Sequence, residues 1–296
     1  MTERLDVAFE GEDGVILRGW LYRPKGGGKK PAITMAHGFA AVKEHGLDNF
    51  ARAFAAEGFV VLVHDHRNFG SSEGSPRHDI DPWRQIADWR RAITFLEMQP
   101  EVDPNRIGIW GTSFAGGHAI VLGATDRRLR CVAAQVPTIS GYDQGQRRVS
   151  PDATAALESA FAEDEREPFR GGAPRKTRVA SDDMAEPAAY RSPDAIAFYT
   201  QSSAKENWTN EVTLRSTRAA RSYEPGIWAP RVSPTPLLLV VALQDTVTVT
   251  DLALRAYENS LEPKRLVTLR GGHFAPYEKE FEAASAAALS WFQQHL

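Results

Sequence analysis

Ser113 carries the strongest chemical signal in the sequence, because it lies between an apolar run (107–110) and a stretch of small residues (114–122). The two stretches read as a strand and a helix. A serine on a tight strand-to-helix turn projects its hydroxyl above the sheet, where it can act as a nucleophile beside the positive end of the helix. The spacing is Gly-x-Ser-x-x-Gly, with Ala115 where the usual motif has its second glycine. The alternative interpretation is a glycine-rich turn in which the serine only caps the helix.

A serine nucleophile needs a general base and a carboxylate that orients the base. Asp245 follows the most apolar late segment (237–243), and His273 follows a Gly-Gly pair after the last predicted strand. The carboxyl ends of parallel strands meet at one edge of a sheet, and the chain order Ser, Asp, His fits this arrangement. We therefore predict Ser113 as nucleophile, His273 as base and Asp245 as orienting acid. Two other aspartates stay open as the acid: Asp143 and Asp251.

The negative oxygen formed during attack on a carbonyl needs two backbone N–H donors. We predict the amide of Phe114, next to the nucleophile, and the amide of Phe39, in a loop after an early apolar strand. We expect His37 to support that loop rather than to act as a base. His45 is expected to be a surface residue at the start of a helix, and contact with substrate is the alternative.

Strand and helix patterns alternate on both sides of these residues, which predicts an α/β class with a parallel sheet covered on both faces. Asp81 followed by proline predicts a helix start. The alternation stops between residues 138 and 233, where the chain is polar and mixed but contains eight aromatic side chains that we single out. We predict a sheet domain formed by residues 1–137 and 234–296, with residues 138–233 inserted as a mainly helical unit. Its aromatic residues either form its own core or line an enclosed acyl site.

Five motifs and single residues, taken in chain order, resemble those of the α/β-hydrolase superfamily over nearly the whole chain. They are His37-Gly38-Phe39, Asp65-His66-Arg67-Asn68-Phe69-Gly70-Ser71-Ser72, Gly111-Thr112-Ser113-Phe114-Ala115-Gly116, Asp245 and His273. More narrowly, the chain resembles bacterial dienelactone-hydrolase-like and acetylxylan-esterase-like proteins, and fungal polyketide transferases that use the Gly-x-Ser-x-x-Gly form. The resemblance implies a mainly parallel eight-stranded sheet flanked by helices, with a helical cap inserted after the sixth strand.

Composition excludes several other classes. The 296 residues carry a formal net charge of −3, which argues against nucleic acid or an anionic membrane as the main partner. The single cysteine, Cys131, cannot form an internal disulfide.

The charged N-terminus predicts no signal peptide, and the longest apolar run is too short to span a bilayer, so we expect a cytoplasmic protein. We predict no cofactor. We also predict no metal, because four histidines lack metal-ligand spacing: His64, His66, His78 and His118.

These observations predict a serine hydrolase that cleaves a carboxylic ester, a thioester or a related acyl bond through an acyl-enzyme. A small-molecule acyl compound is the expected partner, and a homodimer stays open. Acyl transfer from the same intermediate is the first alternative. A peptidase, a carbon–carbon bond hydrolase and a non-catalytic ligand-binding protein are further alternatives.

Overall fold

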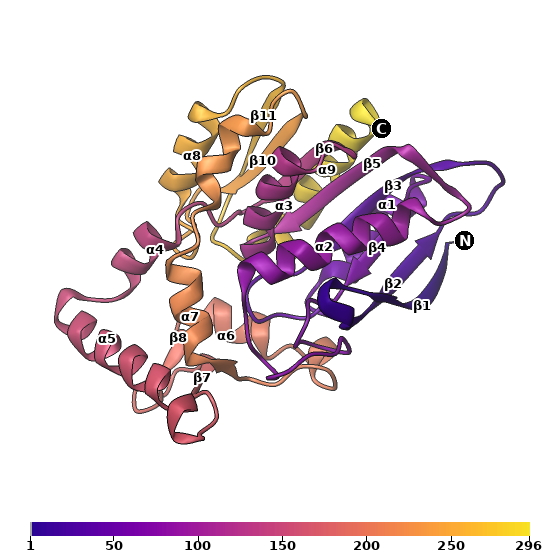
Figure 1. The fold of residues 1–296 in the computed structure, drawn as a ribbon. Coiled ribbons are helices and arrows are strands. Elements are labelled where there is room, and N and C mark those ends of the chain that lie inside the picture. Colours follow the sequence, from indigo (N-terminus) through magenta and orange to yellow (C-terminus); the bar gives the residue numbers. More distant parts are fainter. Residues whose placement is uncertain (1) are drawn as a thin grey trace.

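The computed structural model describes residues 2–296 and is built on an eight-stranded sheet (Figure 1). Its strands are β1 (Glu3–Glu10), β2 (Ile16–Arg23), β3 (Lys30–Ala36), β4 (Val60–His64), β5 (Val102–Thr112), β6 (Leu129–Gln135), β10 (Leu237–Ala242) and β11 (Lys264–Leu269). Their spatial order is β1-β2-β4-β3-β5-β6-β10-β11. β2 pairs antiparallel with β1 and β4, and the other neighbouring strands pair parallel. The carboxyl ends of the six parallel strands, β3 to β6, β10 and β11, therefore share one edge of the sheet.

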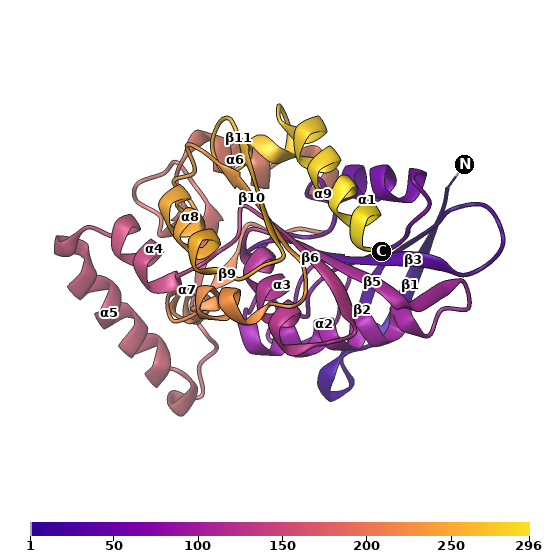
Figure 2. The same ribbon diagram turned by 90° about the horizontal axis from the view of Figure 1, so that it is seen from above.

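Helices cover both faces of the sheet, as the view from above shows (Figure 2). One face packs against α2 (Pro82–Glu97), α3 (Phe114–Thr125) and α8 (Thr250–Asn259), and the other against α1 (Leu47–Ala56) and α9 (Phe281–His295). Because both faces are covered, the central strands are apolar throughout rather than alternating. Asp81 is the predicted N-cap of α2, and its carboxylate accepts hydrogen bonds from the backbone N–H groups of Trp83 and Arg84. Two short 3-10 helices complete this part: η1 (Glu12–Gly14) and η5 (Ala275–Tyr277).

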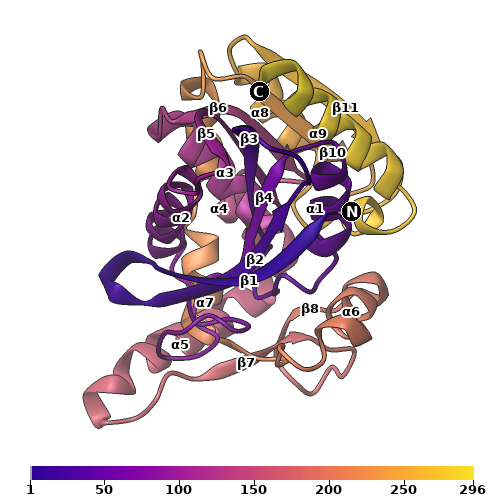
Figure 3. The ribbon, with the colours of Figure 1, turned by 90° about the vertical axis from the view of Figure 1, so that its right-hand side faces the viewer.

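Residues 138–233, which we call the insertion, lie between β6 and β10 and gather at one end of the sheet (Figure 3). The insertion contains α4 (Gly141–Arg148), α5 (Pro151–Arg166), η2 (Pro168–Arg170), β7 (Lys176–Ala180), β8 (Ala188–Tyr190), α6 (Pro193–Tyr199), η3 (Ser202–Ala204), β9 (Val212–Thr213), α7 (Leu214–Arg221) and η4 (Pro225–Arg231). The sequence shows no clean strand pattern here and predicts a mainly helical unit, but β8, β7 and β9 form a small three-stranded sheet within it. Strands this short leave no readable alternation of polar and apolar residues.

Among residues 2–296, no helix is long and apolar enough to cross a lipid bilayer.

Five histidines are buried in this fold, and within residues 2–296 none of their ring nitrogens forms a hydrogen bond with a carboxylate, the nearest approach being 3.9 Å between His37 and Asp65. They are His37, His45, His64, His66 and His118. Burial lowers the pKa of all five, to about 4 for His45 and to about 3 for His64 and His118. Within the described chain, the ring nitrogens of His64 and His66 have no hydrogen-bond partner. The folded protein therefore holds these imidazoles in the neutral form.

We expect the free energy of unfolding to fall steeply as the pH decreases from 6.5 to 5. Below about pH 6.5 the unfolded chain binds protons on these histidines, whereas the folded chain does not, so each one removes up to about 1.4 kcal/mol per pH unit. Urea unfolding between pH 7.5 and 5 measures this slope. A His64→Leu variant should reduce this slope by the contribution of one histidine, which is up to about 1.4 kcal/mol per pH unit. A free energy of unfolding that stays constant over this range would contradict the expectation.

Candidate active site

The structure brings Ser113, His273 and Asp245 together in one chain of hydrogen bonds. The Ser113 hydroxyl donates to Nε2 of His273 at 2.9 Å. Nδ1 of His273 donates to Oδ2 of Asp245 at 2.8 Å. All three side chains are buried, so this chain is shielded from competing water. The distances and the order of groups are those needed for a serine hydroxyl to pass its proton to a carboxylate-oriented imidazole.

The turn between β5 and α3 presents Ser113 in a conformation that L-residues adopt rarely. Its φ is 56° and its ψ is −119°. Neighbouring glycines make room for it: a Cβ on Gly111 would lie 2.1 Å from the carbonyl oxygen of Ala115, and a Cβ on Gly38 would lie 2.9 Å from Cβ of Ser113. The strain is stored at the residue whose hydroxyl is aimed at His273, as expected for a functional turn.

A short loop after β10 holds Asp245. Oδ1 accepts the backbone N–H groups of Val247 and Thr248 at 2.7 and 2.9 Å, and Oδ2 accepts the Thr248 hydroxyl at 2.8 Å. Burial alone would raise the pKa of Asp245. The charge of His273 and these hydrogen bonds outweigh burial and lower the pKa to about 2, so the carboxylate stays ionised. Thr248 was not among the predicted site residues.

The two aspartates left open as the acid lie elsewhere. Asp251 is about half exposed and pairs with Arg147 and Arg255. Asp143 lies in the first turn of α4. The carboxylate that contacts His273 is that of Asp245.

Both residues predicted to supply the oxyanion donors lie close in the fold to the nucleophile. Phe114 is the first residue of α3, so its N–H has no acceptor within the helix. Phe39 follows Gly38, which abuts Ser113, and the rings of Phe39 and Phe114 meet edge to face at 5.6 Å. His37 accepts the backbone N–H of His66 through Nε2 at 3.1 Å, which ties the two loops together as a support would.

The cavity beside Ser113 is only about 10 Å³ in volume. The insertion covers it with Phe198 and Tyr199 of α6, and Phe274 and Tyr277 close another side. Ser113 is consequently 7% exposed. A cavity of this volume is about the size that holds one water molecule.

His45 lines the same cavity, so its predicted surface position is wrong. The side chain is 1% exposed because α6 packs over it. Nδ1 accepts the backbone N–H of Val42 and Nε2 donates to the carbonyl of Tyr199, each at 3.1 Å. The buried position of His45 beside the nucleophile thus depends on Tyr199, a residue more than 150 positions later in the chain.

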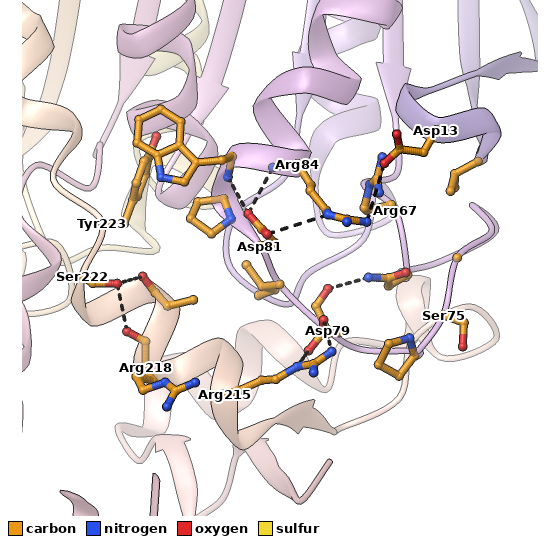
Figure 4. Close-up of a pocket in the computed structure, with 18 residues that line it drawn as sticks. Asp13, Arg67, Ser75, Asp79, Asp81, Arg84, Arg215, Arg218, Ser222 and Tyr223 are labelled. Carbon is orange, nitrogen blue, oxygen red and sulfur yellow. Dashed lines mark hydrogen bonds and ion pairs between the residues drawn. The ribbon is translucent and has the colours of Figure 1, made fainter. Parts of the chain in front are cut away.

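A second, larger cavity of about 610 Å³ lies between α2 and α7 and shares no lining residue with the first (Figure 4). Its arginines are matched by acids. Arg67 is held by Asp88 at 2.6 and 2.7 Å, and Arg215 by Asp79 at 2.7 and 2.8 Å. Arg67 thereby braces a loop. The remaining charged groups around the cavity are of both signs.

Within the described residues, no group of three or more His, Cys, Asp or Glu side chains is arranged to hold a metal ion.

A model of the X-Pro dipeptidyl-peptidase (S15) family matches residues 13–275, a range that contains Ser113, Asp245 and His273. The chain belongs to the S15 family. Among relatives of this S15 chain, the quorum-quenching protein AidA of Acinetobacter baumannii is 34% identical over 93% of this chain and 90% of its own. The thiohydrolase aneE of Aspergillus aculeatus is 33% identical over 88% and 83%.

Solved structures with the α/β-hydrolase fold superimpose on this chain. The alpha/beta hydrolase GrgF from Penicillium sp. sh18 superimposes with a TM-score of 0.85 at 26% identity, covering 99% of both chains. A polyketide transferase grgF from Penicillium sp. is 28% identical over 99% of this chain and 97% of its own. The S15 chain therefore has the α/β-hydrolase fold, and the predicted superfamily is confirmed. It is an enzyme of the serine hydrolase class, as predicted.

Proposed function

We propose that this enzyme cleaves an ester or thioester of a small molecule through an acyl-enzyme on Ser113. The observation that carries the proposal is the unbroken hydrogen-bond chain from the Ser113 hydroxyl through His273 to the ionised Asp245. In this arrangement the serine is activated without any further group.

In the first half of the reaction, Oγ of Ser113 attacks the acyl carbonyl while Nε2 of His273 takes its proton. Negative charge then develops on the carbonyl oxygen, and the N–H groups of Phe39 and Phe114 stabilise it. The imidazolium of His273 returns the proton to the leaving alcohol or thiol as the carbon–oxygen or carbon–sulfur bond breaks. Asp245 stabilises the imidazolium while it exists.

In the second half, a water molecule gives a proton to His273 and attacks the acyl carbon. The tetrahedral intermediate collapses with release of the carboxylic acid, and the proton returns to Oγ of Ser113. Each step uses the same contacts in reverse order, so one arrangement serves both halves.

The substrate class is supported by the enclosure of the site and by the relatives. The insertion acts as a cap, since α6 places Phe198 and Tyr199 over Ser113. An enclosed, aromatic site suits a small acyl compound. The relatives named thiohydrolase and quorum-quenching protein favour small-molecule acyl chemistry over peptide cleavage.

Acyl transfer is the second candidate function. It is favoured by the relative named polyketide transferase and by the burial of Ser113, which limits the access of bulk water to an acyl-enzyme. An alcohol held under the cap would then take the place of water in the second half of the reaction.

Labelling and turnover together test the proposal. We expect a fluorophosphonate probe to modify Ser113 stoichiometrically in the folded protein and not after heat unfolding, with peptide mass spectrometry locating the adduct. We also expect hydrolysis of p-nitrophenyl esters or of N-acetylcysteamine thioesters, in a series from acetyl to dodecanoyl. A folded protein that is neither labelled nor active on either series would overturn the proposal. A transfer product formed in the presence of an added alcohol would favour the second candidate.

A further inference from the structure

The insertion donates two buried or half-buried hydrogen bonds to backbone carbonyls of the loop that carries Phe39. The hydroxyl of Tyr199 donates to the carbonyl oxygen of Phe39 at 2.8 Å. Nε1 of Trp208 donates to the carbonyl oxygen of Ala40, also at 2.8 Å. Both acceptors are backbone groups, so these contacts act on the path of the loop and not on a side chain.

This loop needs outside support because its own conformation is unfavourable. Ala40 has a φ of 52°, in the left-handed region that residues with a Cβ rarely adopt. Within the loop, the N–H of Ala41 reaches the carbonyl of Gly38 only at 3.3 Å. A strained backbone persists where surrounding contacts over-determine it. Tyr199 and Trp208 supply such contacts on the two consecutive carbonyls.

The two donors are themselves fixed in place. The rings of Tyr199 and Trp208 stack with their centroids 5.8 Å apart and an angle of 22° between planes, and Tyr199 also stacks on Tyr190 at 5.4 Å. The carbonyl of Tyr199 accepts Nε2–H of His45, which lies at the far end of the same loop. The insertion and the loop are therefore joined at both ends of the loop.

We propose that Tyr199 and Trp208 are positioning residues that hold the N–H of Phe39 where the oxyanion forms. The inference rests on the proposed function. Gly38 abuts Ser113 on one side of this N–H, and the carbonyls of Phe39 and Ala40 are pinned on the other. The donor thus lies between two fixed points, and its direction is set before substrate arrives. Preorganised donors of this kind stabilise charge that develops in the transition state and contribute little to ground-state binding.

The test is the Tyr199→Phe variant, which removes the hydroxyl and keeps the ring that lines the cavity. Full loss of one oxyanion donor lowers kcat by about 10²- to 10³-fold. A displaced donor should cost less, so we expect kcat for the best ester or thioester to fall about 10- to 100-fold, with KM within about twofold. The affinity for an alkyl boronic acid, which mimics the tetrahedral state on Ser113, should fall in parallel with kcat/KM. A purely structural role would not produce this parallel loss at an unchanged melting temperature.

Ser203→Ala is the matched control. The Ser203 hydroxyl also faces this loop from the insertion, at 3.2 Å from the carbonyl of Glu44, but on the exposed surface and away from Phe39. Ser203→Ala should leave kcat and the affinity for the boronic acid unchanged. Trp208→Phe removes the second donor and should lower kcat in the same manner, and it decides the question if Tyr199→Phe does not fold.

Wild-type kcat and boronic acid affinity in the folded variants, or a loss confined to KM, would overturn the inference. The proposed function is tested separately, because full activity of Ser113→Ala would contradict it. An inactive Ser113→Ala beside a fully active Tyr199→Phe and Trp208→Phe would reject only the positioning role.

Discussion

Replacing Ser113 with alanine is expected to lower kcat for ester or thioester hydrolysis by about 10⁴- to 10⁶-fold. The variant lacks the atom that forms the acyl-enzyme, and His273 then has no hydroxyl within 2.9 Å to activate. Only binding and the two backbone donors would remain, and these give a small residual rate. Steady-state hydrolysis of the p-nitrophenyl series measures the change, with fluorophosphonate labelling of the same preparations alongside it.

Ser222→Ala is a suitable control for this variant. The hydroxyl of Ser222 lies within hydrogen-bond distance of two carbonyls of α7, and the residue lines the larger cavity, away from the hydrogen-bond chain. We expect Ser222→Ala to hydrolyse the p-nitrophenyl esters at the wild-type rate. Retention of more than about one per cent of wild-type kcat by purified Ser113→Ala would be incompatible with a nucleophilic role for this residue.

Replacing Asp245 with asparagine is expected to lower kcat by about 10³- to 10⁴-fold while the fold is kept. Oδ1 still accepts the N–H groups of Val247 and Thr248, so the loop is unchanged. The amide nitrogen then faces Nδ1 of His273, which cannot donate to it, and the imidazole is driven into the wrong tautomer. The pKa of Asp245 is about 2 in the native protein, so the wild-type enzyme needs no pH adjustment to keep this carboxylate charged.

Asp251→Asn and Asp143→Asn provide the comparison, because the sequence left both residues open as the acid. We expect each to change kcat less than about threefold. Asp251 is held by two exposed arginines, and interactions of exposed charges are weak. A larger loss in either variant than in Asp245→Asn would reassign the acid.

The residues at strand ends could be predicted from sequence because their signals are local. An apolar run marks a strand, and the polar residue after it marks the functional edge of a parallel sheet. Ser113, Asp245 and His273 follow β5, β10 and β11 in this way, and the sheet then brings them together with no further information. The helix start at Asp81 was equally local.

The contacts made by the insertion could not be predicted in this way. His45 looks like a residue at a helix start, and its burial depends on residues of the insertion such as Tyr199 and Trp208, which lie more than 150 residues further along the chain. Tyr199 and Trp208 look like ordinary aromatic residues, because nothing nearby in sequence indicates that their partners are carbonyls of residues 39 and 40. Thr248 looks like any loop threonine in the sequence, and only the structure shows that its hydroxyl donates to Oδ2 of Asp245. Such roles depend on tertiary proximity, which periodicity does not encode.

The joining of the insertion to the Phe39 loop bears on how this enzyme can be redesigned. Exchanging residues 138–233 for the equivalent segment of another hydrolase is an obvious route to a new substrate range, because the segment leaves and rejoins the sheet between the neighbouring strands β6 and β10. Such a graft would replace the pocket and also remove the hydrogen bonds to the carbonyls of Phe39 and Ala40. On the positioning role proposed above, a chimera that keeps the wild-type rate needs a tyrosine and a tryptophan in equivalent positions. The segment that sets the substrate range would then also set the catalytic rate.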